Sequence, residues 1–239
     1  MAIQQLHNES EVLLYLIHFP DALPQLARHL QTLNAEETSR MQRFYSEKLQ
    51  QHFALTRGSL RHILGQHLQC APEKINFDYT EHGKPFLKNQ PLQFNLAHSS
   101  DYCVIALCLK DRIGVDIERC SHVHKPYYDI AKRFFTRAEY LALAHCSIHE
   151  GEDLFYHLWT QKEAFLKAIA QGIAFGLNHF EVSTDKSQAF IKNIQDPHLA
   201  QQIWSSQSFT QPSGYRIVVT KENQLTQIHW IKGLQDHPV

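Results

Sequence analysis

The chain has 239 residues, of which 43% are hydrophobic and 20% are charged, and its formal net charge is −1 with histidine neutral. This composition is typical of a folded globular protein with a substantial core. Because no excess of positive charge draws the chain to polyanions, we predict neither a nucleic-acid nor a membrane partner, and any anionic ligand requires a local basic cluster. The five cysteines form no CxxC motif, which favours a reducing, cytoplasmic compartment over disulfide or zinc frameworks.

The first half of the chain predicts helices followed by strands. The apolar run at 12–19 is too short to span a membrane and indicates a buried strand. Asn34, with Glu36 and Glu37 after it, predicts a helix start, and a longer helix is expected over 47–67. Further strands are expected at 75–80, 92–98, 102–109 and 113–118. The last two are expected to form a hairpin within 102–118.

The second half repeats the order of helix and then sheet. Helices are expected around 126–145 and 153–171, and the sequence HEGED at 149–153 is expected to be a polar loop. The expected strands lie near 179–184, 188–194, 214–220 and 225–231. The predicted fold class is therefore α/β (α+β), with two similar α/β lobes at residues 1–119 and 120–239.

The sequence GVDIE places two carboxylates on a strand. Side chains alternate across a strand, so Asp116 and Glu118 share one face, about 7 Å apart at their Cα atoms, while Val115 and Ile117 face the core. Paired carboxylates suit Mg²⁺ or Mn²⁺, whose remaining ligands are often waters and substrate phosphates. The alternative is an exposed strand face with two solvated acids.

Three basic or small-residue clusters could hold phosphate. Gly83, Lys84 and Pro85 form a turn that leaves the backbone open beside a cation. A second cluster, His98, Ser99 and Ser100, ends a predicted strand, and Arg57 and Arg61 share a helix face. The alternatives are an ordinary surface turn, a satisfied strand end and a solvated helix face.

The helix that contains HLWTQKEAFLKAI carries charges beside its apolar stripe. Lys162 falls inside the apolar arc, whereas Glu163 and Lys167 lie together at its edge. Burying an unpaired charge costs on the order of 3 kcal/mol or more, so these residues require partners. Because Glu163 and Lys167 are one turn apart, they can approach one charged ligand together.

In chain order, the motifs GKP, FNLAHS, GVDIE and WTQKEAFLKA resemble the 4′-phosphopantetheinyl transferases of the surfactin-synthetase-activating (Sfp) type. The resemblance covers most of the chain and is strongest from Gly83 to Gly172. It implies two pseudo-symmetric α/β lobes in one monomeric chain, with coenzyme A and a metal ion between them. It also implies Mg²⁺-dependent transfer of 4′-phosphopantetheine from coenzyme A to a serine of an apo acyl or peptidyl carrier protein. The products are the holo carrier protein and adenosine 3′,5′-bisphosphate.

The resemblance also assigns residues. Asp116, Glu118 and Glu163 would hold Mg²⁺, with Mn²⁺ possible, and Glu163 would be a metal ligand, a general base or both. The residues expected to act in catalysis are Glu163, Lys167 and His98. The residues expected to bind coenzyme A are Arg43, Arg57, Gly83, Lys84, Pro85, His98, Ser99, Lys162 and Lys167. Lys162 would also orient the carboxylates.

Two positions depart from the family pattern. Ala97 stands where a serine is usual, and His52 lies near the position that usually carries a basic residue for the 3′-phosphate. The alternatives to a transferase are a catalytically silent module that binds coenzyme A or carrier proteins, and a metal-dependent phosphohydrolase using the same acids. The resemblance leaves the carrier open among fatty acid, polyketide, nonribosomal peptide and siderophore pathways.

Overall fold

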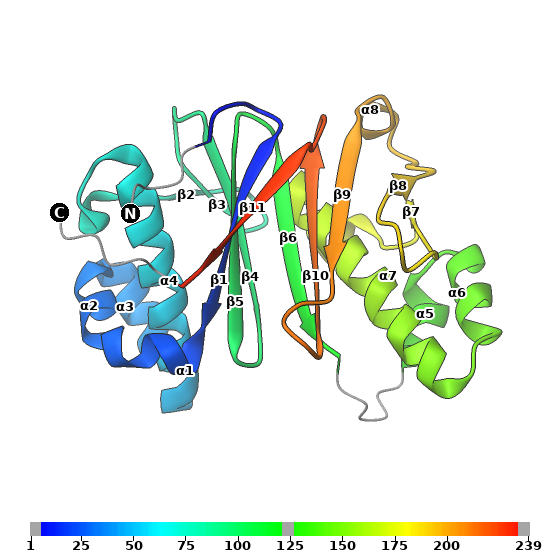
Figure 1. Cartoon of the computed structure of the whole chain (residues 1–239), viewed down its shortest axis with the longest axis horizontal. Coiled ribbons are helices and arrows are strands. Elements are labelled where there is room, and N and C mark those ends of the chain that lie inside the picture. Colours follow the sequence, from blue (N-terminus) through cyan, green and yellow to red (C-terminus); the bar gives the residue numbers. More distant parts are fainter. Residues whose placement is uncertain (1–5, 121–126, 234–239) are drawn as a thin grey trace.

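The computed structural model describes residues 6–120 and 127–233 and consists of two facing β-sheets with helices on their outer sides (Figure 1). The first sheet has the strand order β11–β1–β5–β4, and the second has the order β6–β10–β9. Helices α1 to α4 lie on the outer side of the first sheet, and α7 packs on the outer side of the second, with α5 and α6 against α7. This arrangement confirms the predicted α/β fold class.

The elements of the first half follow the predicted order. Their bounds are β1 Glu11–His18, α1 Phe19–Ala22, α2 Leu26–Thr32, α3 Ala35–Gln42, α4 Glu47–Leu68, β2 Asp78–Tyr79, β3 Pro85–Phe86, β4 Leu92–Ser99 and β5 Tyr102–Leu109. Helix α3 begins at a capping box, in which the Asn34 side chain accepts from the Glu37 backbone N–H and the Glu37 carboxylate accepts from the Asn34 N–H. The predicted strand at 75–80 is shorter than expected, because only Asp78–Tyr79 pairs with β3.

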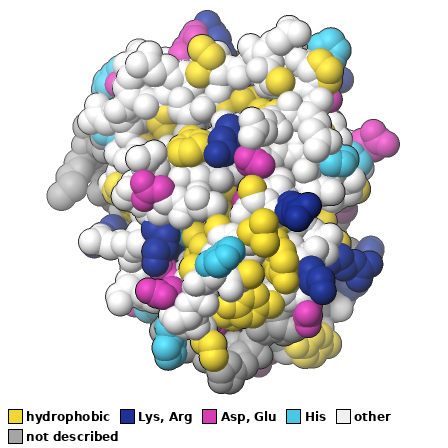
Figure 2. Space-filling model, turned by 90° about the vertical axis from the view of Figure 1, so that its right-hand side faces the viewer, with side chains coloured by type: hydrophobic (Ala, Val, Ile, Leu, Met, Phe, Trp, Pro, Cys, Tyr) yellow, Lys and Arg dark blue, Asp and Glu magenta, His cyan; other side chains and the backbone are white. Residues whose placement is uncertain are grey.

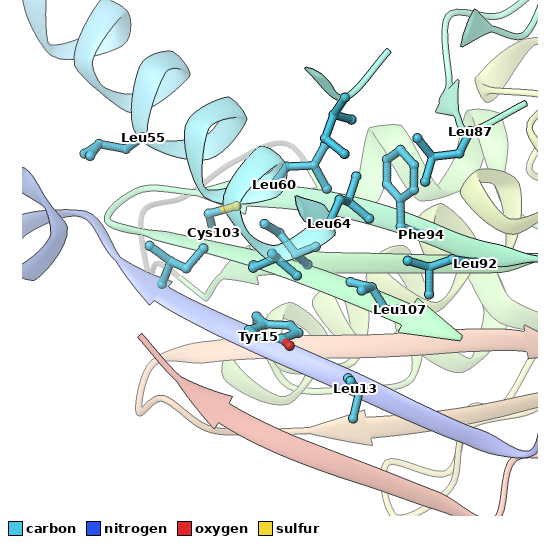
Figure 3. Close-up of a cluster of buried hydrophobic side chains, with 14 of the residues drawn as sticks. Leu13, Tyr15, Leu55, Leu60, Leu64, Leu87, Leu92, Phe94, Cys103 and Leu107 are labelled. Carbon is cyan, nitrogen blue, oxygen red and sulfur yellow. The ribbon is translucent and has the colours of Figure 1, made fainter. Parts of the chain in front are cut away.

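A buried hydrophobic cluster joins α4 to the first sheet (Figure 3). Leu60 and Leu64 of α4 pack with Leu13 of β1, Phe94 of β4 and Leu107 of β5. Because α4 covers one face of β1 and the second sheet covers the other, its side chains are buried on both faces, which explains the nearly continuous apolar run EVLLYLIH. This core fixes α4 against the sheet whose last strand, β4, carries His98.

The elements of the second half include one strand that returns to the first sheet. Their bounds are β6 Ile113–Arg119, α5 Tyr127–Phe134, α6 Arg137–Ala144, α7 Ile148–Ile169, β7 Glu181–Val182, β8 Ile191–Lys192, α8 Pro197–Ala200, β9 Trp204–Phe209, β10 Tyr215–Glu222 and β11 Gln227–Lys232. Residues 149–153 are helical, so the predicted polar loop is wrong. Helix α7 starts earlier because the Glu150 carboxylate accepts hydrogen bonds from the Ser147 N–H and hydroxyl.

The predicted hairpin over 102–118 is also wrong. Strand β5 pairs with β1 and β4, whereas β6 pairs with β10 of the second sheet. In return, β11 pairs in parallel with β1. A division of the chain at residue 119 therefore leaves each helix in the same half as the sheet that it covers. It does not do so for β6 and β11, because each of these strands joins the sheet of the other half.

Helix α7 packs against β6 at Gly114. A Cβ atom at this position would lie 2.0 Å from the Ala164 carbonyl oxygen and 2.4 Å from the Ala168 backbone nitrogen. A side chain there is sterically impossible without moving the helix off the strand. Gly114 therefore permits the close contact that brings α7 side chains next to Asp116.

The facing sides of the two sheets form a shared apolar core. Val115 and Ile117 of β6 pack there with Val12 and Leu14 of β1. The side-chain oxygen of Asn95 accepts a 2.8 Å hydrogen bond from the Val115 backbone N–H and so ties β4 to β6. The intervening residues of β6, Asp116 and Glu118, consequently face the opposite side, toward α7, as predicted from strand alternation.

Figure 2 shows the end of the molecule formed by the second lobe. Hydrophobic side chains gather on this surface beside Lys and Arg side chains. The large hydrophobic side chains exposed on this lobe include Phe134, Leu141 and Ile148, of which Ile148 is 61% exposed. Contiguous apolar surface of this kind is typical of a region that contacts another protein. Across the described residues, no helix has both the length and the apolar character needed to cross a membrane.

Candidate active site

Asp116 and Lys167 form an ion pair where β6 meets α7. The Lys167 Nζ lies 2.6 Å from Asp116 Oδ1, and the Asp116 residue is only 4% exposed. Burial of the Lys167 ammonium opposes its charge, but the carboxylates of Asp116, Glu163 and Glu118 outweigh burial and raise its pKa. Lys167 is therefore held as a cation beside the acids.

Glu118 is oriented by two donors from different elements. The indole Nε1 of Trp159 on α7 donates a 3.1 Å hydrogen bond to Oε1, and the Ser99 hydroxyl donates a 3.4 Å bond to Oε2. The Ser99 Oγ also accepts from the Arg119 backbone N–H at 3.1 Å. Ser99 thus positions an acid, and Trp159 explains why an aromatic residue precedes the KEA sequence on this helix.

Glu163 adds a third carboxylate to the same location. Within the described chain, its Oε1 and the Oδ2 of Asp116 are buried without a hydrogen-bond partner. Burial, together with the negative charges of Asp116 and Glu118, raises the pKa of Glu163 to about 7. Buried carboxylate oxygens without partners, held beside other acids, are the chemistry of a cation site.

The complete three-ligand metal set predicted from the sequence is not assembled. Among residues 6–120 and 127–233, no group of three or more His, Cys, Asp and Glu side chains is placed to hold a metal ion. Within the described part of the chain, Asp116 and Glu163 each offer an unpartnered oxygen, whereas both Glu118 oxygens accept hydrogen bonds. The donor set fits a hard divalent cation through Asp116 and Glu163, with Glu118 beside them.

Lys84 of the GKP turn connects the first lobe to the end of α7. Its Nζ donates to the backbone carbonyls of Lys167 at 2.7 Å, Ile113 at 2.8 Å and Ala168 at 3.4 Å. Burial lowers the pKa of Lys84 to about 8. The sequence predicts that this ammonium contacts a nucleotide, but in the structure its donors bond to backbone carbonyls instead. Gly83, with φ +79°, and Pro85 shape the turn that delivers it.

A basic pocket of about 400 Å³ lies between α4 and the end of β4. Its polar and charged lining residues are Arg40, Lys48, His52, Thr56, Arg57, His98 and Ser100. Among the described residues, Nη1 of Arg57 is buried without a hydrogen-bond partner. His98 lines this pocket at the end of β4, and partial burial together with the charge of Lys167 lowers its pKa. The pocket has the charge and size for a phosphate-bearing ligand.

Three other predicted or considered residues lie elsewhere. Arg43 is exposed and does not line the pocket, so the first-lobe cations at the pocket are Arg40, Lys48 and Arg57 instead. Arg61 is fully buried, with its Nε 2.8 Å from the Glu37 carboxylate. Ala97 faces the core between the sheets, and its neighbour His98 points to the opposite side.

The sequence predicts that Lys162 contacts coenzyme A, but the structure places its side chain in the interior of the second lobe. Its ammonium is fully buried, lies 2.9 Å from Glu139 of α6 and donates to the carbonyls of Leu177 and Phe180. It also lies over the Phe180 ring. Lys162 is therefore a structural cation that joins α7 to α6 through Glu139. Successive side chains of a helix point in different directions, so Lys162 and Glu163 contact different neighbours.

Sequence reasoning noted His52 but missed Lys48 and Thr56, which line the same pocket. Lys48, His52 and Thr56 recur every four residues along α4 and line one pocket. This i, i+4, i+8 spacing was a usable signal for a common polar face. The Ser99–Glu118 and Trp159–Glu118 contacts join separate elements, and no spacing in the sequence indicates them.

Comparison with known proteins gives family matches over most of the chain. Residues 112–220 match the 4′-phosphopantetheinyl transferase superfamily, and residues 21–110 match the N-terminal region of 4′-phosphopantetheinyl transferases. A putative 4′-phosphopantetheinyl transferase of Synechocystis sp. is 36% identical over 181 residues, covering 74% of this chain and 72% of that protein.

Two further relatives carry the same name. The 4′-phosphopantetheinyl transferase HetI of Nostoc sp. is 37% identical over 69% of this chain and 70% of that protein. The 4′-phosphopantetheinyl transferase Sfp of Bacillus subtilis is 30% identical over 72% of this chain and 75% of that protein. The chain therefore belongs to the 4′-phosphopantetheinyl transferase superfamily. It is an enzyme of the transferase class, which confirms the family and the activity class predicted from the motifs.

Proposed function

We propose that this enzyme transfers 4′-phosphopantetheine from coenzyme A to a serine hydroxyl of an apo acyl or peptidyl carrier protein, with Mg²⁺ or Mn²⁺ as cofactor. The observation that carries the proposal is the pair of buried oxygens on Asp116 and Glu163 that find no partner among the described residues, beside the Lys167 ammonium. A phosphate-transfer site has to position its reactants and neutralise spread negative charge, and these residues supply both anionic and cationic groups for that task.

Each side chain has a defined task in this reaction. A divalent cation bound by Asp116 and Glu163 would neutralise charge on the pyrophosphate of coenzyme A. Glu163 takes the proton of the carrier serine as the new bond from serine oxygen to the β-phosphorus forms. The bond from that phosphorus to the bridging oxygen breaks, and adenosine 3′,5′-bisphosphate leaves with the electron pair. Lys167 stabilises the charge that develops on the phosphate oxygens.

The basic pocket would hold the nucleotide end of coenzyme A. Arg57 has a buried guanidinium nitrogen without a partner in residues 6–120 and 127–233, and Lys48 and His52 lie one helical turn apart on the same side of α4. His98 would contact a phosphate between this pocket and the acids. Lys84 contributes indirectly, because it holds the carbonyl end of α7 and thereby Lys167.

The test is the intact mass of purified apo carrier proteins after incubation with the enzyme, coenzyme A and Mg²⁺. We expect a gain of one phosphopantetheine on at least one carrier in a panel drawn from fatty acid, polyketide, nonribosomal peptide and siderophore systems. Glu163→Gln should remove the gain. Cleavage of coenzyme A without a carrier would instead support a phosphohydrolase, and coenzyme A binding without any turnover would support a silent module.

We also propose that the enzyme acts as a cytoplasmic monomer. The two elements that form the acid cluster, β6 and α7, belong to one chain. The cysteines are free thiols, as is typical of a reducing compartment: Cys70, Cys103, Cys108, Cys120 and Cys146. Light scattering of the purified chain should give a mass of one subunit. A dimer that dissociates with loss of carrier modification would contradict this.

A further inference from the structure

Arg216 of β10 lies directly opposite Glu118 of β6 in the register of the second sheet. Directly opposite residues of antiparallel strands project from the same face, with their Cβ atoms about 4.5–5.5 Å apart. Asp116 and Glu118 face α7, so Arg216 also projects from the face of the sheet on which α7 packs. The acid cluster therefore has a second cation near it, which approaches from β10, whereas Lys167 approaches from α7.

Arg216 is bonded to the first half of α7. The residue is 4% exposed, its Nη2 donates a 2.8 Å hydrogen bond to Asp153 Oδ1, and its Nη1 donates a 3.3 Å bond to Nδ1 of His157. A guanidinium can only donate, so the imidazole nitrogen must accept. Burial and the charge of Arg216 lower the pKa of His157 to about 4. His157 thus provides a hydrogen bond to Arg216 but no charge that balances it.

The charge of Arg216 is only partly balanced by Asp153. The same carboxylate also accepts a 2.7 Å hydrogen bond from Lys186, so one negative charge serves two cations. The Nε of Arg216 is buried and has no hydrogen-bond partner among the described residues. Burial raises the pKa of the Cys120 thiol to about 11, an effect that the charge of Arg216 opposes and that of Glu118 reinforces. The guanidinium charge is therefore felt on the face of β6 that carries Glu118.

The Glu118 carboxylate lies among groups that Arg216 can influence. Trp159, which donates to Glu118 Oε1, follows His157 by two residues on α7, so the bond from Arg216 to His157 also anchors the helical segment that carries the indole. Asp116 and Glu163 place like charges beside Glu118, and a cation on the β10 side opposes the resulting repulsion.

We propose that Arg216 is a positioning residue for carrier modification. Its guanidinium attracts the Glu118 carboxylate and anchors the α7 segment that carries Trp159, so that Glu118 is held in one orientation beside Asp116 and Glu163. Arg216 acts through Glu118 and makes no contact with the reacting atoms. This inference rests on the proposed function, so its first test needs no turnover.

The first test follows the indole N–H signals of the full chain labelled with ¹⁵N. Trp159→Phe identifies the Trp159 signal, and the Trp204 signal serves as the internal reference. Arg216→Met should shift the Trp159 signal in the same direction as Glu118→Gln, because both variants disturb the acceptor of this indole. Arg216→Lys retains the cation and should shift it less. An unmoved Trp159 signal in Arg216→Met would overturn the proposal, whether or not the chain modifies carriers.

Lys221→Met is the matched control for the loss of a buried cation from β10. Lys221 is fully buried and paired with Asp111, and its side chain projects from the opposite face of the strand. We expect this variant to lower the midpoint of thermal unfolding, as Arg216→Met does, while it leaves the Trp159 signal in place. Equal shifts of the Trp159 signal in the two variants would indicate general loosening of the strand and would exclude a specific role for Arg216.

The second test is the rate of carrier modification, measured below the unfolding midpoints of all variants. Arg216→Met should lower kcat about tenfold with little change in the KM for coenzyme A, and Arg216→Lys should restore most of the rate. Lys221→Met should retain the wild-type rate. Equal losses in the Met and Lys variants of Arg216 would show that its charge is not what acts.

A double-mutant cycle with Glu118 separates positioning from a general structural role. In the Glu118→Gln background, Arg216→Met should cause no further loss of rate, because the two residues act as a unit. A further tenfold loss would mean that Arg216 acts by another route. If the wild type modifies no carrier, the proposed function fails, and the Trp159 signal still decides whether Arg216 positions Glu118.

Discussion

The Nζ of Lys167 lies 2.6 Å from Oδ1 of Asp116, and this ion pair closes the contact between α7 and β6. It leaves the second Asp116 oxygen, Oδ2, and Oε1 of Glu163 buried without partners in the described chain. A cation on the helix therefore shares Asp116 with the site proposed for a metal ion. This relationship yields predictions that measurements of binding and stability can check separately from activity.

Lys167→Met should raise the affinity for Mn²⁺ and lower turnover. The variant removes an ammonium that competes with the metal for Asp116, so metal binding becomes more favourable. It also removes a charge that stabilises the transferring phosphate, which we expect to cost about 10²-fold in rate. Electron paramagnetic resonance of free Mn²⁺ measures the first effect and carrier mass analysis the second. A weaker affinity for Mn²⁺ would mean that Lys167 supports the metal site instead of competing with it.

Glu163→Gln should stabilise the metal-free protein at neutral and higher pH. The folded-state pKa of Glu163 is raised from 4.5 to about 7 by burial and by the neighbouring acids. The folded state therefore binds more protons than the unfolded state between these pH values, and stability falls as pH rises through them. Above pH 7 the wild type thus carries a penalty that the glutamine variant lacks, of about 2 kcal/mol after allowance for partial exposure.

Urea unfolding in the presence of a chelator measures this difference. Below pH 4.5 the two proteins should be equally stable within error, since Glu163 is then protonated in both states. A constant difference at every pH would indicate a packing effect of the amide and not the titration of Glu163.

Gly114→Ala should destabilise the fold by about 3 kcal/mol or more, because the new Cβ overlaps the α7 backbone and must push the helix from β6. The control is Gly214→Ala, where φ is +79° but no atom of the described residues lies within 4 Å of the added Cβ. That variant should lose only about 1 kcal/mol, from backbone strain. Thermal and urea unfolding compare the two, and equal losses would contradict the close contact.

Lys84→Met should lower the free energy of unfolding by about 1–3 kcal/mol, because three carbonyl groups at the β6–α7 junction lose their charged donor. The KM for coenzyme A should change little compared with that of Arg57→Met. The opposite pattern, with stability retained and a large rise in KM, would restore the nucleotide contact predicted from the sequence for Lys84.

Trp159→Phe should reduce turnover about tenfold, since Glu118 loses the indole donor that orients one oxygen. Trp204→Phe is the matched control, because it removes an indole hydrogen bond to the Leu199 carbonyl elsewhere in the second lobe. Carrier modification by the two variants should differ clearly. Similar rates would show that the Trp159 indole N–H is not needed to place Glu118.

Much of the candidate site follows from local periodicity. Alternation along β6 sets Asp116 and Glu118 on one face and Val115 on the other, and the helical repeat sets Glu163 and Lys167 together. The helix start at Asn34 likewise follows from a side chain that bonds to the next turn. These properties are decided within one element, so a few neighbouring residues contain all the necessary information.

Contacts between elements were decided only by the tertiary structure. The sequence alone does not assign β6 to the second sheet, direct Lys84 to the carbonyl end of α7 or pair Lys162 with Glu139. Each depends on which surfaces pack together, and the close approach at Gly114 is one example. Local sequence therefore determined which side chains point the same way. Long-range packing determined what they meet, because burial in a shared core selects among many possible arrangements of the same elements.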